Sequence, residues 1–351
     1  MNPPNRRRTV PVNVGGVVIG GAAPISVQTM TKTQTEDASA TLAQIERVAK
    51  AGADIVRVTC DTDEAGAALR EIVKGSPLPI VADIHYDAPL ALKALEAGVA
   101  CLRLNPGNIS DPDKVRDIAV EAKARQVPIR IGVNSGSIPQ RKELARGRGT
   151  SIEETAELMV NAAMGHIQIL RELDFHNIKV SLKASDVLTN LAVNRRFAAL
   201  DVPYPLHLGL TEAGPTESGS IKSAMGIGIL LSEGIGDTIR VSLVAEPEEE
   251  VRVGRQILAN LEEHSEGPNL IACPTCGRLE IDMVPMVAQV EEALSNVKRS
   301  LTVSVMGCVV NGPGEGMHAD IGIAGGRQKG ILYKGGRVIA SLPQDKLIGT
   351  L

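Results

Sequence analysis

Residues 79–134 of the chain read PIVADIHYDAPLALKALEAGVACLRLNPGNISDPDKVRDIAVEAKARQVPIRIGVN, and this stretch decides the fold. Three short β-branched runs start at Pro79, Ala100 and Pro128, and the helix-like segments APLALKALEAG and DPDKVRDIAVEAKA lie between them. Both helical segments begin beside an Asp, and the first stops at Gly98, as helices commonly do. Strands that alternate with helices of this length predict a parallel sheet built from βαβ units.

The same alternation continues on both sides of this stretch. Further strands are predicted in PISVQTM from Pro24, DIVRVTC from Asp54, IKVSLKAS from Ile178, PLHLGLTEAG from Pro205 and DTIRVSL from Asp237. Eight strands and eight helices over about 240 residues match a (β/α)8 TIM barrel. A doubly wound open sheet is the alternative, which the count of eight units disfavours. A hairpin, VPVNVGGVVIGG, precedes the first strand, and SGSIPQRKELARGRGT after the fifth is predicted to be a loop over the barrel mouth.

The composition changes near residue 264, where HSEGPN is typical of a linker. After it we predict a strand (LIACPT), a helix from Asp282, a strand (LTVSVMGCVV), a loop and three short strands. This order is that of a smaller α+β module. The predicted domains are therefore a barrel over residues 1–262, which binds the substrate, and an α+β domain over residues 267–351.

Composition excludes several classes of protein. The 351 residues include no Trp, two Phe and three Tyr, and the net charge is −4, which argues against base stacking and against binding to a phosphate backbone. No run of 18 apolar residues predicts a membrane span. The first residues, MNPPNRRRTV, lack the apolar core of a secretory signal, so we expect a cytoplasmic protein. Five cysteines, an odd number, favour metal ligands or buried thiols over a disulfide framework.

The predicted strands share an unusual feature, a cation between aliphatic neighbours. IVRVT, CLRLN, PIRIG and TIRVS each contain an Arg, and VSLKA contains a Lys. Because side chains alternate along a strand, each cation points away from its two neighbours. Following this alternation gives one polar face, which comprises Ser26, Gln28, Arg57, Thr59, Asp83, His85, Arg103, Asn105, Arg130, Asn134, Lys183, His207, Thr211, Arg240 and Ser242.

This polar face is expected to point into the barrel, near the carboxyl ends of the strands, where TIM-barrel enzymes carry their active sites. Only Asp83 and the nearby Glu212 oppose its five cations. Burying unpaired cations costs several kcal/mol each, so we expect a multiply anionic ligand such as a phosphate or diphosphate rather than a purely structural network. His85 and His207 are expected either to serve the ligand or to form hydrogen bonds in the core.

Three cysteines of the second module form a candidate metal site. Cys273 and Cys276 form a CxxC pair, and Cys308 follows in GCVVNGPGEG, with His318 and Glu315 as candidates for a fourth ligand. Zinc and a four-iron cluster both fit this spacing. The glycines of NGPG permit close backbone approach to cluster sulfurs, which favours iron–sulfur.

The cysteines leave a third alternative open, a disulfide between Cys273 and Cys276, although no thioredoxin-like βαβ context surrounds them. Cys60 and Cys101 lie on predicted strands among aliphatic residues. We expect these two to be buried structural thiols.

The motifs IACPTCGR, MGCVVNGPGEG, KVSLKASD, PLHLGLTEAG and LLSEGIGDTIRVSL together resemble the bacterial hydroxymethylbutenyl diphosphate synthase family of the non-mevalonate isoprenoid pathway, in its two-domain form. The resemblance runs from VQTM near residue 27 to about residue 335. It implies an oxidoreductase that converts 2-C-methyl-D-erythritol 2,4-cyclodiphosphate to 4-hydroxy-3-methylbut-2-enyl diphosphate by two-electron reductive ring opening with loss of water.

The resemblance also implies cofactors and partners. A [4Fe-4S] cluster would be held by Cys273, Cys276, Cys308 and Glu315. Reduced flavodoxin or ferredoxin would supply single electrons. The family enzyme is a head-to-tail homodimer in which the cluster of one subunit closes the barrel mouth of the other.

The family's substrate-binding residues fall on Arg57, Arg103, Arg130, Asn134, Lys183, Glu212, Arg240 and Ser242. All but Glu212 already belong to the polar face, and His85 is added to the substrate-binding set from that face. Glu315 is expected to be catalytic by yielding its iron to a substrate oxygen, and Glu212 by moving a proton or positioning a hydroxyl. Two other interpretations stay open. One is a phosphate-ester lyase or transferase in which a zinc ion only stabilises the second domain, and the other is a non-enzymatic redox or iron sensor.

Overall fold

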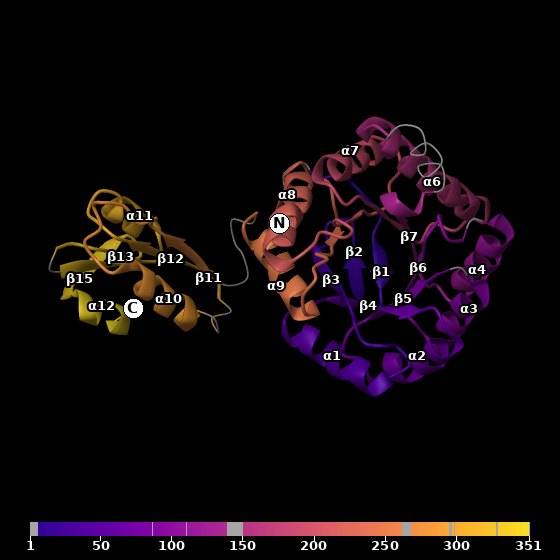
Figure 1. The fold of residues 1–351 in the computed structure, drawn as a ribbon, viewed down its shortest axis with the longest axis horizontal. Helices are drawn as coiled ribbons and strands as arrows, with labels where there is room; N and C mark the ends of the chain where they lie inside the picture. Colours follow the sequence, from indigo (N-terminus) through magenta and orange to yellow (C-terminus); the bar gives the residue numbers. More distant parts are fainter. Residues whose placement is uncertain are drawn as a thin grey trace. The chain divides into compact units, whose positions relative to one another are not determined.

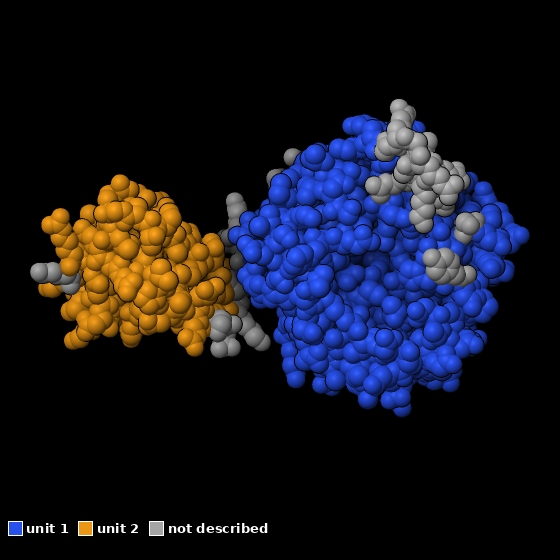
Figure 2. Space-filling view, in the orientation of Figure 1, with its two compact units in different colours: residues 1–261 blue, residues 262–351 orange. Residues whose placement is uncertain are grey.

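The computed structural model consists of two compact units, residues 1–261 and residues 262–351 (Figure 2). The residues that it describes are 6–85, 87–109, 111–138, 150–261, 268–294, 297, 299–327 and 329–350. Most of the predicted mouth loop (139–149) and of the predicted linker (262–267) therefore lie outside the described residues.

The first unit is built around eight parallel strands, in the order β8-β7-β6-β5-β4-β3-β10-β9. These are β3 (Ser26–Met30), β4 (Ile55–Cys60), β5 (Ile80–Ile84), β6 (Cys101–Leu104), β7 (Ile129–Asn134), β8 (Ile178–Lys183), β9 (His207–Leu208) and β10 (Thr238–Ile239). A bridge between Val180 and Leu206 joins β8 to β9 and closes the ring. The predicted TIM barrel is confirmed.

Helices surround the strands on the outside, as Figure 1 shows. They are α1 (Ala38–Lys50), α2 (Asp63–Gly75), α3 (Ala88–Ala97), α4 (Pro112–Ala124), α6 (Ile152–Glu172), α7 (Val187–Ala198), α8 (Thr216–Ser232) and α9 (Pro247–Ala259), with a 3-10 turn η1 (Ser135–Ser137) after β7. Side chains such as Thr62 and Asp186 cap these helices, and Ser151 and Glu154 form a full capping box. No helix in the described part of the chain is long and apolar enough to cross a membrane.

The barrel core lies between the strands and the helices. It contains aliphatic side chains almost throughout, for example Val56, Val58 and Ile131, which are fully buried. Burying each such side chain contributes roughly 1.5–3 kcal/mol. Because one face of every strand is used for this packing, the alternate face is left to point into the barrel.

A hairpin of β1 (Val12–Val14) and β2 (Val17–Ile19) covers the end of the barrel at which the strands begin. Its turn is formed by Gly15 and Gly16, which have φ of +58° and +96°. The hairpin packs against Ile55, Val81 and Cys101, the first inward residues of their strands. This apolar plug leaves the carboxyl ends of the strands as the open end of the barrel, and the predicted hairpin is confirmed.

The segment before the hairpin is fastened to the barrel by a buried carboxylate. Asp237 accepts from Arg6 Nη2 at 2.9 Å, from Thr9 Oγ1 at 3.1 Å and from the backbone N–H of Leu206 at 2.8 Å. Asp237 is 2% exposed. Removing one partner of a buried ion pair is costly, because the other partner is left buried without its counter-charge.

The second unit has a five-stranded mixed sheet in the order β11-β12-β13-β14-β15, with its own apolar core. Its elements are β11 (Pro268–Ala272), α10 (Met283–Leu294), β12 (Leu301–Met306), α11 (Gly312–His318), β13 (Ile321–Ala324), β14 (Lys329–Lys334), β15 (Arg337–Pro343) and α12 (Gln344–Thr350). The three strands β11, β12 and β13 are parallel to one another, and β14 and β15 are antiparallel. The predicted α+β architecture is confirmed.

One local prediction is wrong, because the expected loop after β12 contains helix α11. Its glycines are used for close packing: a Cβ on Gly312 would lie 2.6 Å from Ala324 Cβ, and one on Gly316 would lie 2.6 Å from the Tyr333 ring. Gly314 faces open space. Tertiary packing thus overrides the poor helix propensity of glycine here.

Candidate active site

The polar side chains of the barrel strands meet in one cavity of about 230 Å³. Its lining residues are Arg57, Asp83, His85, Arg103, Arg130, Asn134, Ser181, Lys183, Leu210, Thr211, Arg240 and Ser242. They come from the ends of β4 to β10, which are far apart in sequence and adjacent in the ring. The cavity therefore lies where the fold predicts an active site, at the carboxyl ends of the strands.

Two glycines on the barrel strands make room for the long cationic side chains. A Cβ on Gly132 would lie 2.6 Å from Arg103 Nε and 3.1 Å from Ser181 Oγ. A Cβ on Gly209 would lie 2.7 Å from Lys183 Nζ, and Gly209 has φ of +155°. A larger residue at Gly132 would displace Arg103, and one at Gly209 would clash with the Arg240 carbonyl oxygen as well as with Lys183.

Asp83 is the single carboxylate among the described residues that line the cavity. Its Oδ1 accepts from Arg103 Nη1 at 2.9 Å, and its Oδ2 lies 3.5 Å from Arg57 Nε and 3.4 Å from His85 Nε2. Burial by itself raises the pKa of Asp83, but Arg57 and Arg103 outweigh burial and hold this pKa well below its usual range. Asp83 is therefore ionised and neutralises about one of the surrounding cations.

The remaining cations are not neutralised within the cavity. Arg130 is 1% exposed, and its Nε and Nη1 have no hydrogen-bond partner among the described residues. Burial and the neighbouring Arg103 lower the pKa of Arg130 to about 10. Burial, followed by repulsion from Arg240 and Arg130, lowers the pKa of Lys183 well below its usual value. Both pKa values are lowered because burial removes these cations from water and the neighbouring cations repel them.

The excess of buried positive charge indicates what kind of ligand the cavity binds. Five cationic side chains face one carboxylate, and removing a cation from water without a partner costs several kcal/mol. An anion with several oxygens relieves this cost, since guanidinium groups donate two parallel hydrogen bonds to phosphate oxygens. The charge of the cavity therefore makes it a candidate anion site.

His85 lies at the cavity wall, where its position is fixed by neighbouring side chains. Its Nδ1 lies 2.6 Å from Asn108 Nδ2, and its Nε2 lies 3.4 Å from Arg103 Nη1. The imidazole is about one third exposed. It is therefore held at a boundary from which it can contact both a ligand and the Asp83–Arg103 pair.

Some residues of the predicted polar face do not reach the cavity. His207 is fully buried below it, and neither ring nitrogen has a partner among the described residues. Burial and the nearby Lys183 lower the pKa of His207 well below its usual value, so the imidazole is neutral. Thr59 bonds to Thr35. Ser26, Gln28 and Asn105 are also buried and outside the lining.

Glu212 is exposed and does not line the cavity, although its neighbour Thr211 does. Its φ of +54° lies in the left-handed region, which is uncommon for a residue other than glycine. Such strain is typical of functional loops. The structure therefore places Glu212 beside the cavity but leaves its side chain facing solvent.

Sequence reasoning missed several residues around the cavity. Ser181 and Lys179 share the inward face of β8 with Lys183, so strand alternation was a sufficient signal for both. Ser181 lines the cavity, while Lys179 lies deeper beside Cys101, where burial lowers its pKa to about 8. Glu250, on helix α9, contacts Arg240 from outside the cavity, and because it lies on a helix no strand pattern could reveal it.

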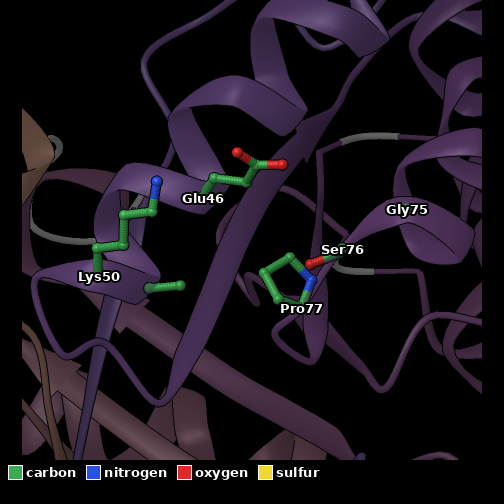
Figure 3. A pocket seen from close by; sticks show the side chains of 6 residues that line it. Glu46, Lys50, Gly75, Ser76 and Pro77 are labelled. Carbon is green, nitrogen blue, oxygen red and sulfur yellow. The ribbon is translucent and has the colours of Figure 1, made fainter.

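A larger hollow of about 550 Å³ lies elsewhere on the first unit, between α1 and the end of α2 (Figure 3). Of its lining residues only Glu46 and Lys50 are charged, and their charges are opposite. This hollow lacks convergent charged groups and is not a candidate active site.

The second unit carries the candidate metal ligands at one edge of its sheet. Cys273 directly follows β11 and Cys308 follows β12, and these adjacent strands are parallel, so both cysteines lie at their carboxyl ends. Cys273 N–H donates to Val305 O at 2.9 Å, which continues the ladder. Glu315 lies in the first turn of α11, which follows Cys308.

The donor chemistry of this edge fits a metal cluster. Cys273, Cys276 and Cys308 are all free thiols, so the structure contains no disulfide between the first two. The ring of His318, the other candidate ligand, bonds through Nδ1 to Gly314 O at 2.8 Å. Within the described ranges, no three His, Cys, Asp or Glu side chains are already gathered as a metal site. Three thiols and the Glu315 carboxylate, which lies in the first turn of α11, are nevertheless a suitable donor set for iron–sulfur.

The other two cysteines are fully buried, as predicted. Burial raises the pKa of Cys60 to about 12. Cys101 packs against the hairpin plug. Both are therefore inert thiols of the barrel.

Comparison with known proteins gives a consistent picture. Residues 9–255 match the family model described as the GcpE TIM-barrel domain, and residues 269–351 match the GcpE protein C-terminal domain. The chain is 50% identical over 346 residues to a protein of Magnetococcus marinus (99% of this chain, 92% of that protein) and 51% identical over 347 residues to one of Dehalococcoides mccartyi (99% and 97%). Both are named 4-hydroxy-3-methylbut-2-en-1-yl diphosphate synthase (flavodoxin).

Among solved structures, the dihydropteroate synthase of Yersinia pestis superimposes with a TM-score of 0.50 at 13% identity. The match covers 71% of this chain and 98% of that one. At this identity the similarity concerns the barrel fold alone.

Proposed function

The chain belongs to the GcpE family of 4-hydroxy-3-methylbut-2-en-1-yl diphosphate synthases, and from this premise we propose how its residues serve the reaction. The enzyme is an oxidoreductase of non-mevalonate isoprenoid biosynthesis. It opens 2-C-methyl-D-erythritol 2,4-cyclodiphosphate by a two-electron reduction, with loss of water, to 4-hydroxy-3-methylbut-2-enyl diphosphate. The observation that carries the proposal is the cavity with five cations and one carboxylate.

The charge of the cavity suits the change in charge during ring opening. The reduction removes oxygen from carbon, so the bridging oxygen stays on phosphorus and becomes a new phosphate oxyanion. The opened diphosphate is therefore more negative than the cyclic one. A preformed excess of cations stabilises this developing charge more than it stabilises the substrate, which is how a binding site accelerates a reaction.

We assign the diphosphate to the cationic residues Arg57, Arg103, Arg130, Lys183 and Arg240, with Asn134, Ser242 and His85 as further hydrogen-bonding partners. Arg103 is held by Asp83 and by its bond to Gly132 O at 3.0 Å. Arg130 keeps two donor nitrogens that have no partner in the described part of the chain. Fixed donors of this kind hold the diphosphate in one orientation, so that the carbon to be reduced is held in place.

For Glu212 we propose a role at the mouth of the cavity. Its carboxylate follows Thr211, which lines the cavity, and a rotation of the strained Glu212 backbone would turn the side chain inward. There it would deliver a proton to the departing hydroxyl or hold that hydroxyl in position.

For the second unit we propose a [4Fe-4S] cluster held by Cys273, Cys276, Cys308 and Glu315. When bound, such a cluster supplies single electrons and a Lewis-acidic iron. Glu315 is the ligand suited to exchange, because a hard carboxylate leaves iron more readily than a thiolate does. It lies in the first turn of α11, the helix that follows Cys308.

The relatives' name supports flavodoxin as the electron donor, and ferredoxin is the alternative. We further propose a head-to-tail homodimer in the bacterial cytoplasm, as the family resemblance implies. Analytical ultracentrifugation of the cluster-loaded enzyme tests the dimer.

Anaerobic purification tests the cofactor. We expect about four irons and four sulfides per chain, and an EPR signal after reduction that responds to addition of the cyclodiphosphate. One zinc per chain without iron would contradict the proposal. Binding of the cyclodiphosphate to the barrel, measured calorimetrically on the same preparation, tests the cavity separately.

A further inference from the structure

Glu250 is a buried carboxylate that lies outside the cavity and contacts its wall. It belongs to the first turn of α9 and is 2% exposed. Its Oε2 accepts from Thr29 Oγ1 at 3.0 Å and from Arg240 Nη2 at 3.4 Å. Its Oε1 accepts from the backbone N–H of Leu243 at 3.1 Å and lies 3.4 Å from Lys32 Nζ. One carboxylate thus joins β3, the end of β10 and α9.

These contacts hold the middle of the chain after β10, whose two ends are held by backbone bonds from Arg240 N–H to Leu208 O at 2.9 Å and from Val244 N–H to Gly214 O at 3.0 Å. Regular pairing of β10 ends at Ile239, yet Arg240 and Ser242, which follow, both line the cavity. The backbone N–H of Leu243 is bonded to Glu250 and not to a neighbouring strand. Glu250 therefore fixes Leu243, the residue next to Ser242, between these two backbone bonds.

Lys32 completes the attachment. Its Nζ donates to Leu243 O at 2.9 Å and also to Ala245 O. The Glu250–Lys32 pair consequently satisfies both backbone polar groups of Leu243, which is 7% exposed. A buried N–H or C=O without a partner is unfavourable, so the loss of Glu250 would release this backbone.

We propose that Glu250 is a positioning residue for the diphosphate site, which fixes the guanidinium of Arg240 and the backbone that carries Ser242. This inference rests on the proposed function of the cavity. Glu250 engages Arg240 through Nη2, while Arg240 Nε is buried without a partner among the described residues. The contact thus orients the guanidinium and leaves donors for a phosphate.

A charge is required at this position, not only an acceptor. Two of the four donors around Glu250 belong to the cations Arg240 and Lys32. In Glu250→Gln an amide NH2 would replace one oxygen and face at least one of the former donors. The side-chain volume would be kept, while the orientation of Arg240 would be lost.

The test compares Glu250→Gln with wild type in the cluster-loaded, anaerobic enzyme. We expect the Kd for the cyclodiphosphate, measured by calorimetry, and the KM to rise about tenfold or more, since a hydrogen bond to a charged group is lost. The value of kcat should also fall, because Arg240 belongs to the cations that stabilise the developing charge, while the EPR spectrum of the cluster should change little. The matched control is Glu248→Gln: Glu248 lies in the same helical turn but pairs with Arg47 at the surface, and we expect wild-type binding.

A double-mutant cycle separates positioning from a general structural role. If Glu250 acts through Arg240, the effect of Glu250→Gln shrinks to less than half in an Arg240→Ala background. An equal fold-loss in both backgrounds, or wild-type affinity of Glu250→Gln, overturns the inference. If Glu250→Gln does not fold, Thr29→Val removes one donor to the same carboxylate. A two- to threefold rise in Kd then supports the inference, and unchanged affinity overturns it.

The same experiment distinguishes failure of the inference from failure of the proposed function. A wild-type enzyme that does not bind the cyclodiphosphate contradicts the function of the cavity, and the positioning role falls with it. Wild-type binding that is tight, together with equal binding by the Glu250 variant, contradicts the positioning role alone.

Discussion

Replacing Gly132 by Ala tests the cation site through a single methyl group. Gly132 lies on the inward face of β7, and the added Cβ would lie 2.6 Å from Arg103 Nε and 3.1 Å from Ser181 Oγ. Backbone atoms of a central strand cannot yield, so Arg103 must move. Its 2.9 Å contact with Asp83 and its 3.0 Å bond to Gly132 O then stretch or break.

The magnitude follows from two costs. Overpacking a buried site destabilises a protein by typically 1–3 kcal/mol, which lowers Tm by about 2–4 °C per kcal/mol in a domain of this size. Displacing Arg103 from the ligand loses a charge-assisted hydrogen bond of roughly 1.5–3 kcal/mol. This second cost corresponds to an approximately 10- to 150-fold rise in Kd.

The assay is calorimetric titration with the cyclodiphosphate, alongside thermal unfolding. The control is Gly136→Ala, two residues beyond β7, because a Cβ there meets nothing within 4 Å. We expect Gly136→Ala to bind as wild type does. Unchanged affinity in Gly132→Ala, with the variant folded, would refute the assignment of Arg103 to the ligand.

The other predictions concern charge, the cluster edge and stability. Lys183→Ala should weaken cyclodiphosphate binding about tenfold or more, because a buried cation facing the ligand is lost; unchanged Kd would contradict its role. Since the pKa of Lys183 is lowered in the free cavity and an anion raises it again, binding should take up protons, and affinity should fall as pH rises through the lowered pKa. Calorimetry in two buffers of different ionisation enthalpy measures this uptake, and equal heats would exclude it. Glu315→Ala should lose most turnover while the barrel still binds the cyclodiphosphate, and full activity would rule out its exchange role. Asp237→Ala should lower the free energy of unfolding by about 3–5 kcal/mol, because Arg6 is left buried without its carboxylate; urea denaturation checks this value, and a loss under 1 kcal/mol would contradict it.

Strand alternation was enough to predict most of the cavity. Arg57, Arg103, Arg130 and Arg240 each lie between aliphatic residues, and a side chain that breaks such a pattern has only the barrel interior to point into. The same rule does not say how high in the barrel a residue lies. His207 follows the pattern and is nevertheless buried below the cavity.

Other features depend on contacts that no local pattern encodes. Glu250 reaches the site from a helix, where the two further glutamates in the same turn, Glu248 and Glu249, are half-buried. Helix α11 forms because Gly312 and Gly316 pack against strands 12 to 17 residues later in the chain. The outward direction of Glu212 follows from a left-handed backbone that its residue type does not favour.

Product formation is the most direct test of the proposed reaction. The anaerobically prepared, cluster-loaded chain is mixed with the cyclodiphosphate and reduced flavodoxin, and 4-hydroxy-3-methylbut-2-enyl diphosphate is quantified against the electrons consumed. We expect one product for every two electrons, and loss of this turnover in Glu315→Ala. A chain that holds its cluster and binds the cyclodiphosphate, yet forms no product, would contradict it.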